Sequence, residues 1–134
     1  LPWVMIGSDG EIPLPAPSAS LPYIHPRSFG AFARFLRWAI DGRTVSLPEA
    51  IRKMTSLPAH TFGFRDRGIL REGAYADLVL FDPHKVRDRA SLENPFRAAE
   101  GFDLVFVNGT LTLEGGQLTG ARAGRFLAPD KDRV

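Results

Sequence analysis

The chain begins with a short run of consecutive apolar residues, Trp3 to Ile6, followed by Gly7-Ser8-Asp9-Gly10. An apolar run of this length without polar interruption is typical of a strand buried on both faces. The glycines on either side of Asp9 allow the backbone to turn directly after the strand. In barrel folds, catalytic side chains lie at this position, just beyond the carboxyl end of a strand. The pattern therefore predicts a barrel strand over residues 3–6 that carries Asp9 at its end.

Helical periodicity replaces this pattern after residue 27. Apolar residues at three- and four-residue spacing, led by the phenylalanines at 29, 32 and 35, predict a first helix with these side chains on its core face. Gly42 stands where helices commonly end, and Ser46-Leu47-Pro48-Glu49 has the form of a capping box that opens a second helix. We expect Pro58 to break that helix. The predicted elements are helices over residues 28–41 and 46–57 and a last helical turn over residues 59–63.

Beyond Gly68 the hydrophobic period becomes that of strands. The predicted strands cover residues 76–82, 103–109, 110–114 and 117–119. Asn108-Gly109 is the strongest hairpin signal in the chain, and Gly115-Gly116 gives a second tight turn. Residues 84–101 are expected to form a connecting loop.

A proline-rich segment, residues 11–26, separates Asp9 from the first helix. Six of the 11 prolines lie within the first 26 residues, and proline donates no backbone hydrogen bond to a helix or sheet. We therefore expect an irregular and fairly stiff loop. Long loops after a barrel strand often line a functional site, and a plain surface connection is the alternative.

Composition is that of an ordinary globular protein and excludes several classes of function. The 17 basic and 15 acidic residues are interleaved, so neither nucleic acid nor a membrane is expected as a partner. The absence of cysteine rules out disulfides and thiolate metal sites and fits a cytoplasmic protein. No apolar run approaches the roughly 20 residues of a membrane helix. Because Leu1-Pro2-Trp3 contains neither an initiator methionine nor a signal-peptide pattern, we expect the chain to be an internal portion of a longer protein.

Several motifs occur together, in the order that one enzyme family has them. They are Gly7-Ser8-Asp9-Gly10, His25-Pro26-Arg27, the segment from Ser46 to Thr55, Pro58-Ala59, Asp66-Arg67-Gly68, the segment from Arg71 to Asp82, and Val107-Asn108-Gly109. Over residues 3–127 the chain resembles the C-terminal part of N-acyl-D-amino-acid deacylases (D-aminoacylases), in the amidohydrolase superfamily. The Gly-x-x-Ala-Asp-Leu-Val run that begins at Gly73 is common to many amidohydrolases. Ser-Asp-Gly together with His-Pro-Arg is more specific to the deacylases.

The resemblance implies an α/β fragment: the last strand and helices of a metal-dependent hydrolase barrel of the TIM type, followed by the C-terminal half of a small β-sandwich domain. Residues 1–66 would form the barrel end, residues 67–127 the β-domain, and residues 128–134 a tail. The family's other metal ligands are not among these 134 residues. We therefore expect zinc in the full-length enzyme, no zinc and no activity in the isolated chain, and the N-terminal part of the same enzyme as a partner.

Asp9 and Arg27 are the candidate site residues that the resemblance implies. Asp9 would be catalytic, accepting a proton during amide hydrolysis and passing it to the leaving amine, and it is a candidate zinc ligand in the full-length enzyme. Arg27 would bind the carboxylate of the acyl-amino-acid substrate, which a planar guanidinium grips through two parallel hydrogen bonds. From the residues alone, the alternatives are a turn aspartate and an arginine in a surface ion pair.

Other readings stay open. His25, His60 and His84 are too widely spaced to predict a shared metal site, and we expect His25 to position the loop. The chain is also compatible with the tail of a cyclic amidase such as a dihydropyrimidinase or dihydroorotase. A third reading is a non-catalytic, β-rich module that forms a homodimer through unpaired strand edges.

Overall fold

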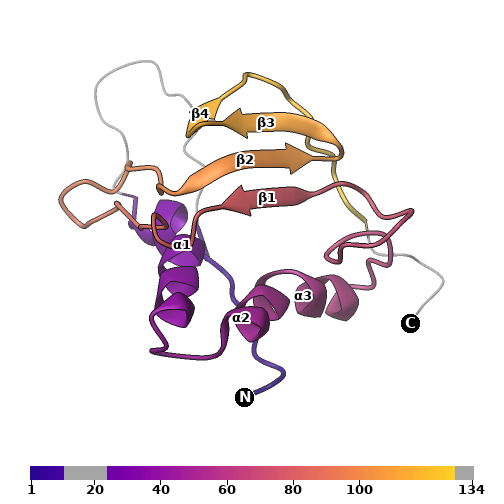
Figure 1. The fold of residues 1–134 in the computed structure, drawn as a ribbon, viewed down its shortest axis with the longest axis horizontal. Helices are drawn as coiled ribbons and strands as arrows, with labels where there is room; N and C mark the ends of the chain where they lie inside the picture. The colour runs from indigo at the N-terminus through magenta and orange to yellow at the C-terminus, as the bar shows by residue number, and fades with distance from the viewer. Residues whose placement is uncertain (11–23, 129–134) are drawn as a thin grey trace.

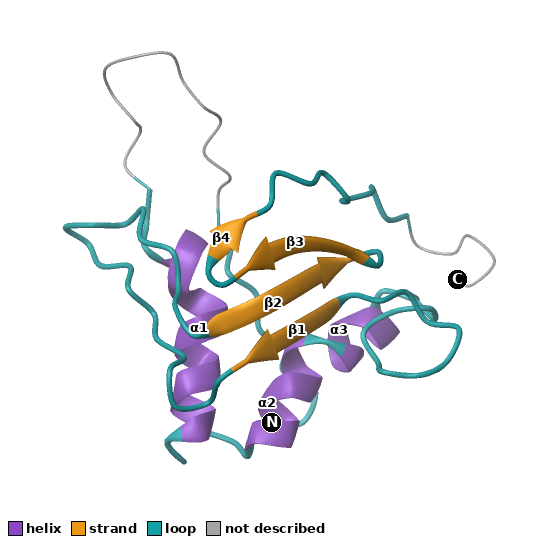
Figure 2. Cartoon of the chain, turned by 45° about the horizontal axis from the view of Figure 1, so that its top comes forward, coloured by secondary structure: helices purple, strands orange, loops and turns teal. Residues whose placement is uncertain are grey.

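The computed structural model describes residues 1–10 and 24–128, so most of the predicted proline-rich loop and the tail residues 129–134 lie outside the described part. Within it, the helices precede the strands. The elements are α1 (Arg27–Ile40), α2 (Leu47–Met54), α3 (Ser56–Thr61), β1 (Leu78–Phe81), β2 (Phe102–Val107), β3 (Thr110–Glu114) and β4 (Gln117–Leu118). β1 is the strand nearest to α2 and α3, and the sheet extends away from them toward β4 (Figures 1 and 2).

α1 forms where the sequence predicts it, but its buried face is not the phenylalanine face. Its buried residues are Gly30, Ala33, Leu36 and Ala39, whereas Phe32 is 45% exposed. Small residues are needed because the segment around Asp88 lies directly against the helix. A Cβ on Gly30 would come within 2.0 Å of the Asp88 carboxylate, and Arg34 Nε donates to that carboxylate at 2.7 Å. The segment around Asp88 therefore packs against α1 at Gly30, a position where a residue with a side chain would not fit.

The second helical region differs from the prediction at both ends. Ser46 is the N-cap residue of α2, but its side chain makes no capping hydrogen bond. Glu49 instead accepts two hydrogen bonds from Arg52, at 2.7 and 2.9 Å. The break falls at Thr55, which leaves the helical region (φ −131°, ψ −85°), and Pro58 lies in the first turn of α3. Proline is accepted there because first-turn N–H groups have no partner within a helix.

The four strands of the described chain form one antiparallel sheet in the order β1-β2-β3-β4. Asn108 and Gly109 adopt φ values of 49° and 81° between β2 and β3, and Gly115 and Gly116 adopt 56° and 81° between β3 and β4. Positive φ at both central residues defines the tight hairpin turn that matches the twist of the flanking strands. Both predicted hairpins are therefore confirmed. β3 has the predicted bounds, β1 and β4 are shorter than predicted, and β2 both begins and ends earlier than predicted.

The predicted barrel strand over residues 3–6 is wrong for the described chain, because these residues do not form a strand. A strand needs neighbouring strands to satisfy its backbone groups, whereas this segment lies against α2: the Ile6 N–H donates to the Lys53 carbonyl at 3.3 Å. Lys53, only 5% exposed, donates from Nζ to the carbonyl oxygens of Leu1 (2.7 Å) and Val4 (2.8 Å). A buried lysine of α2 therefore fixes the segment that leads to Asp9.

The buried apolar core lies among the helices and the long connection between β1 and β2. Its members in the described residues are Ile24, Ala33, Leu36, Ala39, Ala50, Ala59, Val86 and Ala90. On β1, by contrast, Leu78, Val79 and Leu80 are 38%, 53% and 56% exposed. The single sheet seen here is thus only partly covered, and the second sheet of a sandwich is not among the described strands. None of the helices described is long and apolar enough to cross a membrane.

Candidate functional site

The two candidate site residues meet in the structure. Arg27 Nη2 lies 2.9 Å from Asp9 Oδ2, and Arg27 Nε donates to the backbone carbonyl oxygen of Asp9 at 3.0 Å. The two residues are 18 positions apart in the sequence. One guanidinium therefore contacts both the side chain and the main chain of Asp9.

The backbone at Asp9 adopts the left-handed conformation, with a φ of 47°. Aspartate is one of the few residues with a side chain that adopts this conformation readily. The turn is closed by Gly10, whose N–H donates to Ser8 Oγ at 3.2 Å. Gly10 also packs against the start of α1, where an added Cβ would lie 2.9 Å from the Ser28 Cα. This close approach brings the turn, and with it Asp9, to the end of the helix that carries Arg27.

Arg27 is the first residue of α1, and His25 orients it there. The Arg27 N–H, which has no partner within the helix, donates to His25 Nδ1 at 3.1 Å, and the Ser28 N–H donates to the His25 carbonyl at 3.0 Å. Because Nδ1 accepts, a neutral His25 carries its proton on Nε2. The sequence predicts only that His25 positions the loop. It gives no signal for the hydrogen bond to the first N–H of α1, because Pro26 is the N-cap residue and histidine is not among the usual capping residues.

The pair is accessible to solvent. The side chain of Asp9 is 90% exposed and that of Arg27 is 47% exposed. An exposed ion pair contributes at most about 1 kcal/mol to stability, so the contact is a weak stabiliser of the fold. The pair matters more for chemistry than for stability, because it places a carboxylate that can accept a proton beside a guanidinium that can bind an anion.

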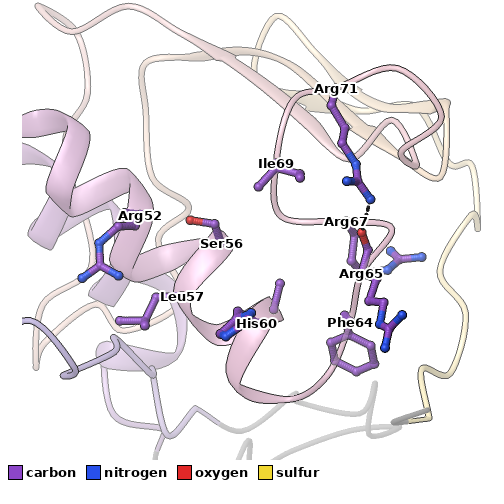
Figure 3. A pocket seen from close by; sticks show the side chains of 10 residues that line it. Arg52, Ser56, Leu57, His60, Phe64, Arg65, Arg67, Ile69 and Arg71 are labelled. Carbon is purple, nitrogen blue, oxygen red and sulfur yellow. Dashed lines mark hydrogen bonds between the residues drawn. The ribbon is translucent and has the colours of Figure 1, made fainter. Parts of the chain in front are cut away.

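A separate pocket of about 490 Å³ opens between α2, α3 and the chain that follows α3 (Figure 3). It is lined by Arg52, Ser56, Leu57, Ala59, His60, Phe64, Arg65, Arg67, Ile69 and Arg71. Three of its arginines already have partners: Arg52 pairs with Glu49, Arg67 pairs with Asp77, and Arg71 donates to the carbonyl of Arg65. Neither Asp9 nor Arg27 lines this pocket, so it is distinct from the predicted site.

Among the described residues, Glu49 has the most strongly perturbed carboxyl group, and it pairs with Arg52 of this pocket. Hydrogen bonds from Arg52 hold the pKa of Glu49 at about 2; partial desolvation opposes this shift, and the charges of Arg52 and Lys53 reinforce it. Glu49 therefore stays ionised at neutral pH. It acts as the counter-ion that orders Arg52, which in turn donates to the Pro2 carbonyl.

The described residues do not form a metal centre by themselves. Among them, no group of three or more His, Cys, Asp or Glu side chains is arranged to hold a metal ion. Asp9, the predicted candidate ligand, offers a single carboxylate that Arg27 already contacts. A catalytic zinc normally has three protein ligands, and no such set lies together among the described residues.

The sequence and the fold of this chain both match those of known proteins. The chain matches the amidohydrolase family over residues 3–113, and it belongs to that family. It is 42% identical over 129 residues to the N-acyl-D-aspartate deacylase of Alcaligenes xylosoxydans xylosoxydans, covering 96% of this chain and 24% of the relative. It is 44% identical over 125 residues to a D-aminoacylase of the same organism, covering 92% of this chain and 24% of the relative.

Solved structures agree with this assignment. A crystal structure of D-aminoacylase superposes with a TM-score of 0.80 at 42% identity, over 92% of this chain and 25% of that one. The N-acyl-D-glutamate deacylase of Bordetella bronchiseptica, solved with zinc and a phosphonate inhibitor, gives 0.73 at 39% identity, over 90% and 26%. The predicted resemblance to deacylases is thus confirmed, and the chain spans about a quarter of the length of these relatives.

Proposed function

We propose that this chain belongs to a zinc-dependent enzyme that hydrolyses N-acyl-D-amino acids to a carboxylate and a free D-amino acid. The observation that carries the proposal is 42–44% identity to two such deacylases over 92–96% of the chain. A cyclic amidase is the weaker alternative. The relatives that match over 92–96% of the chain are deacylases, which cleave open-chain amides.

The contact between Asp9 and Arg27 supports a division of labour between them. Arg27 binds the α-carboxylate of the substrate through its planar guanidinium. In an acyl-amino acid the amide nitrogen is attached to the carbon that bears this carboxylate. A base that lies 2.9 Å from Arg27 is therefore close to the leaving nitrogen. Asp9 accepts a proton from the water that attacks the amide carbonyl and delivers it to that nitrogen as the carbon–nitrogen bond breaks, a role worth about 10² to 10⁴ in rate.

Zinc, when bound in the full-length enzyme, polarises the amide carbonyl. Asp9 is the candidate zinc ligand of the described residues, and the remaining ligands come from outside them. The relatives differ in the side chain of their substrates, D-aspartate in one and D-glutamate in another. This chain is nearly equally similar in sequence to both of these relatives. We therefore propose the substrate class, N-acyl-D-amino acids, and no side-chain preference.

The partly exposed sheet fits the same proposal. The apolar side chains of β1, which are 38–56% exposed from Leu78 to Leu80, are covered in the full-length enzyme by the rest of its chain, which is about three times as long as this part in the relatives. If the chain is instead a non-catalytic module, this surface forms a homodimer.

The cytoplasm is the location that fits a sequence without cysteine.

The test is a comparison of Asp9→Asn with Asp103→Asn in the full-length enzyme, using N-acetyl-D-amino acids and their L-enantiomers. Asp103 is an exposed strand residue remote in sequence from the candidate site, so its variant controls for the loss of a carboxylate. We expect wild type and Asp103→Asn to hydrolyse the D-substrates. In Asp9→Asn we expect kcat to fall by about 10² or more, because an amide does not accept the proton. Zinc content should be largely retained, because the remaining ligands come from outside these residues. An Asp9→Asn rate within threefold of wild type would refute the role of Asp9, and an inactive wild type would refute the proposed function.

A further inference from the structure

The contact between Arg27 and Asp9 uses only one edge of the guanidinium. An arginine guanidinium is planar and has five N–H donors, which allow it to bind in two ways: side-on through Nε and one Nη, or end-on through both Nη atoms. Asp9 occupies the side-on edge, with its carbonyl oxygen on Nε at 3.0 Å and its carboxylate on Nη2 at 2.9 Å. The end-on edge has no protein partner among the described residues, and the Arg27 side chain is 47% exposed.

We propose that Arg27 is a positioning residue for Asp9 as well as the residue that binds the substrate carboxylate. Its side-on edge holds the general base, and its end-on edge remains available for the substrate. The inference rests on the proposed function and extends it. Binding of the carboxylate and orientation of the base are then carried out by one rigid group, which fixes the base relative to the amide nitrogen of the substrate.

The backbone at Asp9 explains why the base needs this support. Asp9 adopts the left-handed conformation, with a φ of 47°, which is uncommon for a residue with a side chain. The hydrogen bond from Arg27 Nε to the Asp9 carbonyl is a direct contact to the peptide group of this turn. Since the Asp9 side chain is 90% exposed, little packing orients the carboxylate, and the guanidinium supplies the direction.

The first experiment uses a substrate analogue that cannot form the charged contact through two oxygens with the end-on edge. Full-length enzyme is assayed on an N-acetyl-D-amino acid and on its neutral carboxamide analogue, as wild type, Arg27→Lys and Arg34→Lys. Arg34 is the matched control: it lies on the same helix, its side chain is 50% exposed, and it forms a 2.6 Å ion pair with Asp88. A lysine keeps the charge but has no Nε–Nη edge.

If Arg27 orients the base, Arg27→Lys lowers kcat on the carboxamide by about tenfold to hundredfold, since a misplacement of about 1 Å costs roughly 10² in rate. On the carboxylate substrate the same kcat loss is joined by a rise in KM. Arg34→Lys stays within twofold of wild type on both substrates. An unchanged or raised kcat of Arg27→Lys on the carboxamide would overturn the inference while leaving the proposed function intact, because Arg27 would then bind only the substrate.

Chemical rescue separates lost orientation from a damaged fold. Guanidinium ion at millimolar concentration, added to Arg27→Ala, is expected to restore kcat on the carboxamide in a saturable manner, and to have no effect on the Arg27→Ala/Asp9→Asn double variant. Equal stimulation of both variants would count against the inference.

A crystal structure of full-length Arg27→Ala gives a readout that does not depend on activity. The inference requires Asp9 to leave the left-handed conformation or its carboxylate to turn away from the end of α1. Retention of the wild-type conformation of Asp9 would refute it. This measurement also decides the matter if the wild-type enzyme proves inactive on both substrates, an outcome that would refute the proposed function alone.

Discussion

Substitution of Lys53 by methionine should release the segment that carries Asp9. Methionine retains most of the apolar stem of the buried lysine but removes the ammonium group that donates to the carbonyls of Leu1 and Val4, at 2.7 and 2.8 Å. Hydrogen bonds to charged groups are worth about 1.5–3 kcal/mol each. Leu1 and Val4 are 79% and 45% exposed, so water can solvate their carbonyls after the substitution. The expected loss of local stability is therefore about 2–4 kcal/mol rather than the full sum.

Hydrogen–deuterium exchange measures this loss directly, because it reports local opening instead of global unfolding. The Ile6 amide, which donates to the Lys53 carbonyl, is the probe, and its protection should fall by about 30- to 1,000-fold at 1.4 kcal/mol per tenfold. Lys85→Met is the control, since Lys85 also forms an ion pair but is 71% exposed. Equal protection of Ile6 in the two variants would show that Lys53 does not hold the segment.

Three further predictions follow from single contacts. Gly101→Ala should destabilise the connection before β2 by about 2 kcal/mol more than Gly73→Ala, as measured by hydrogen exchange. Both glycines have positive φ, but of the two only Gly101 is so close to the backbone that an added Cβ would lie 2.4 Å from the Val86 nitrogen. Glu49→Gln should destabilise α2 at pH 7, and the difference from wild type should fade as pH falls from 4.5 toward 2. The sign follows because the folded-state pKa of about 2 lies below the ordinary 4.5, so the ionised form stabilises the fold above this window. His25→Asn, which retains an acceptor near Nδ1, should keep KM for the acyl-D-amino acid close to wild type. His25→Phe should raise KM, because the Arg27 N–H then loses its hydrogen-bond acceptor. Equal KM values would exclude this role of His25.

The sequence by itself determined the elements whose causes are local. Asn108-Gly109 and Gly115-Gly116 specify tight turns because glycine and asparagine accept positive φ, and both hairpins form at these positions. The apolar spacing after residue 28 likewise specified α1. The motif around Asp9 and the motif around Arg27 were sufficient to name both candidate residues and the deacylase resemblance, since each consists of neighbouring residues.

Tertiary structure decided everything that depends on a distant neighbour. Residues 3–6 are apolar enough for a buried strand, but in the described chain their backbone lies against Lys53 of α2, so no strand forms. Glu49 has the spacing of a capping residue, but its carboxylate accepts hydrogen bonds from Arg52 instead. The buried face of α1 is the one that contains Gly30, which Asp88 approaches from 58 positions away in the sequence, and not the phenylalanine stripe. The contact between Asp9 and Arg27 also depends on distant residues. Each of the two was predicted from its own motif, but the guanidinium reaches Asp9 because the close approach between Gly10 and Ser28 places the turn at the start of α1.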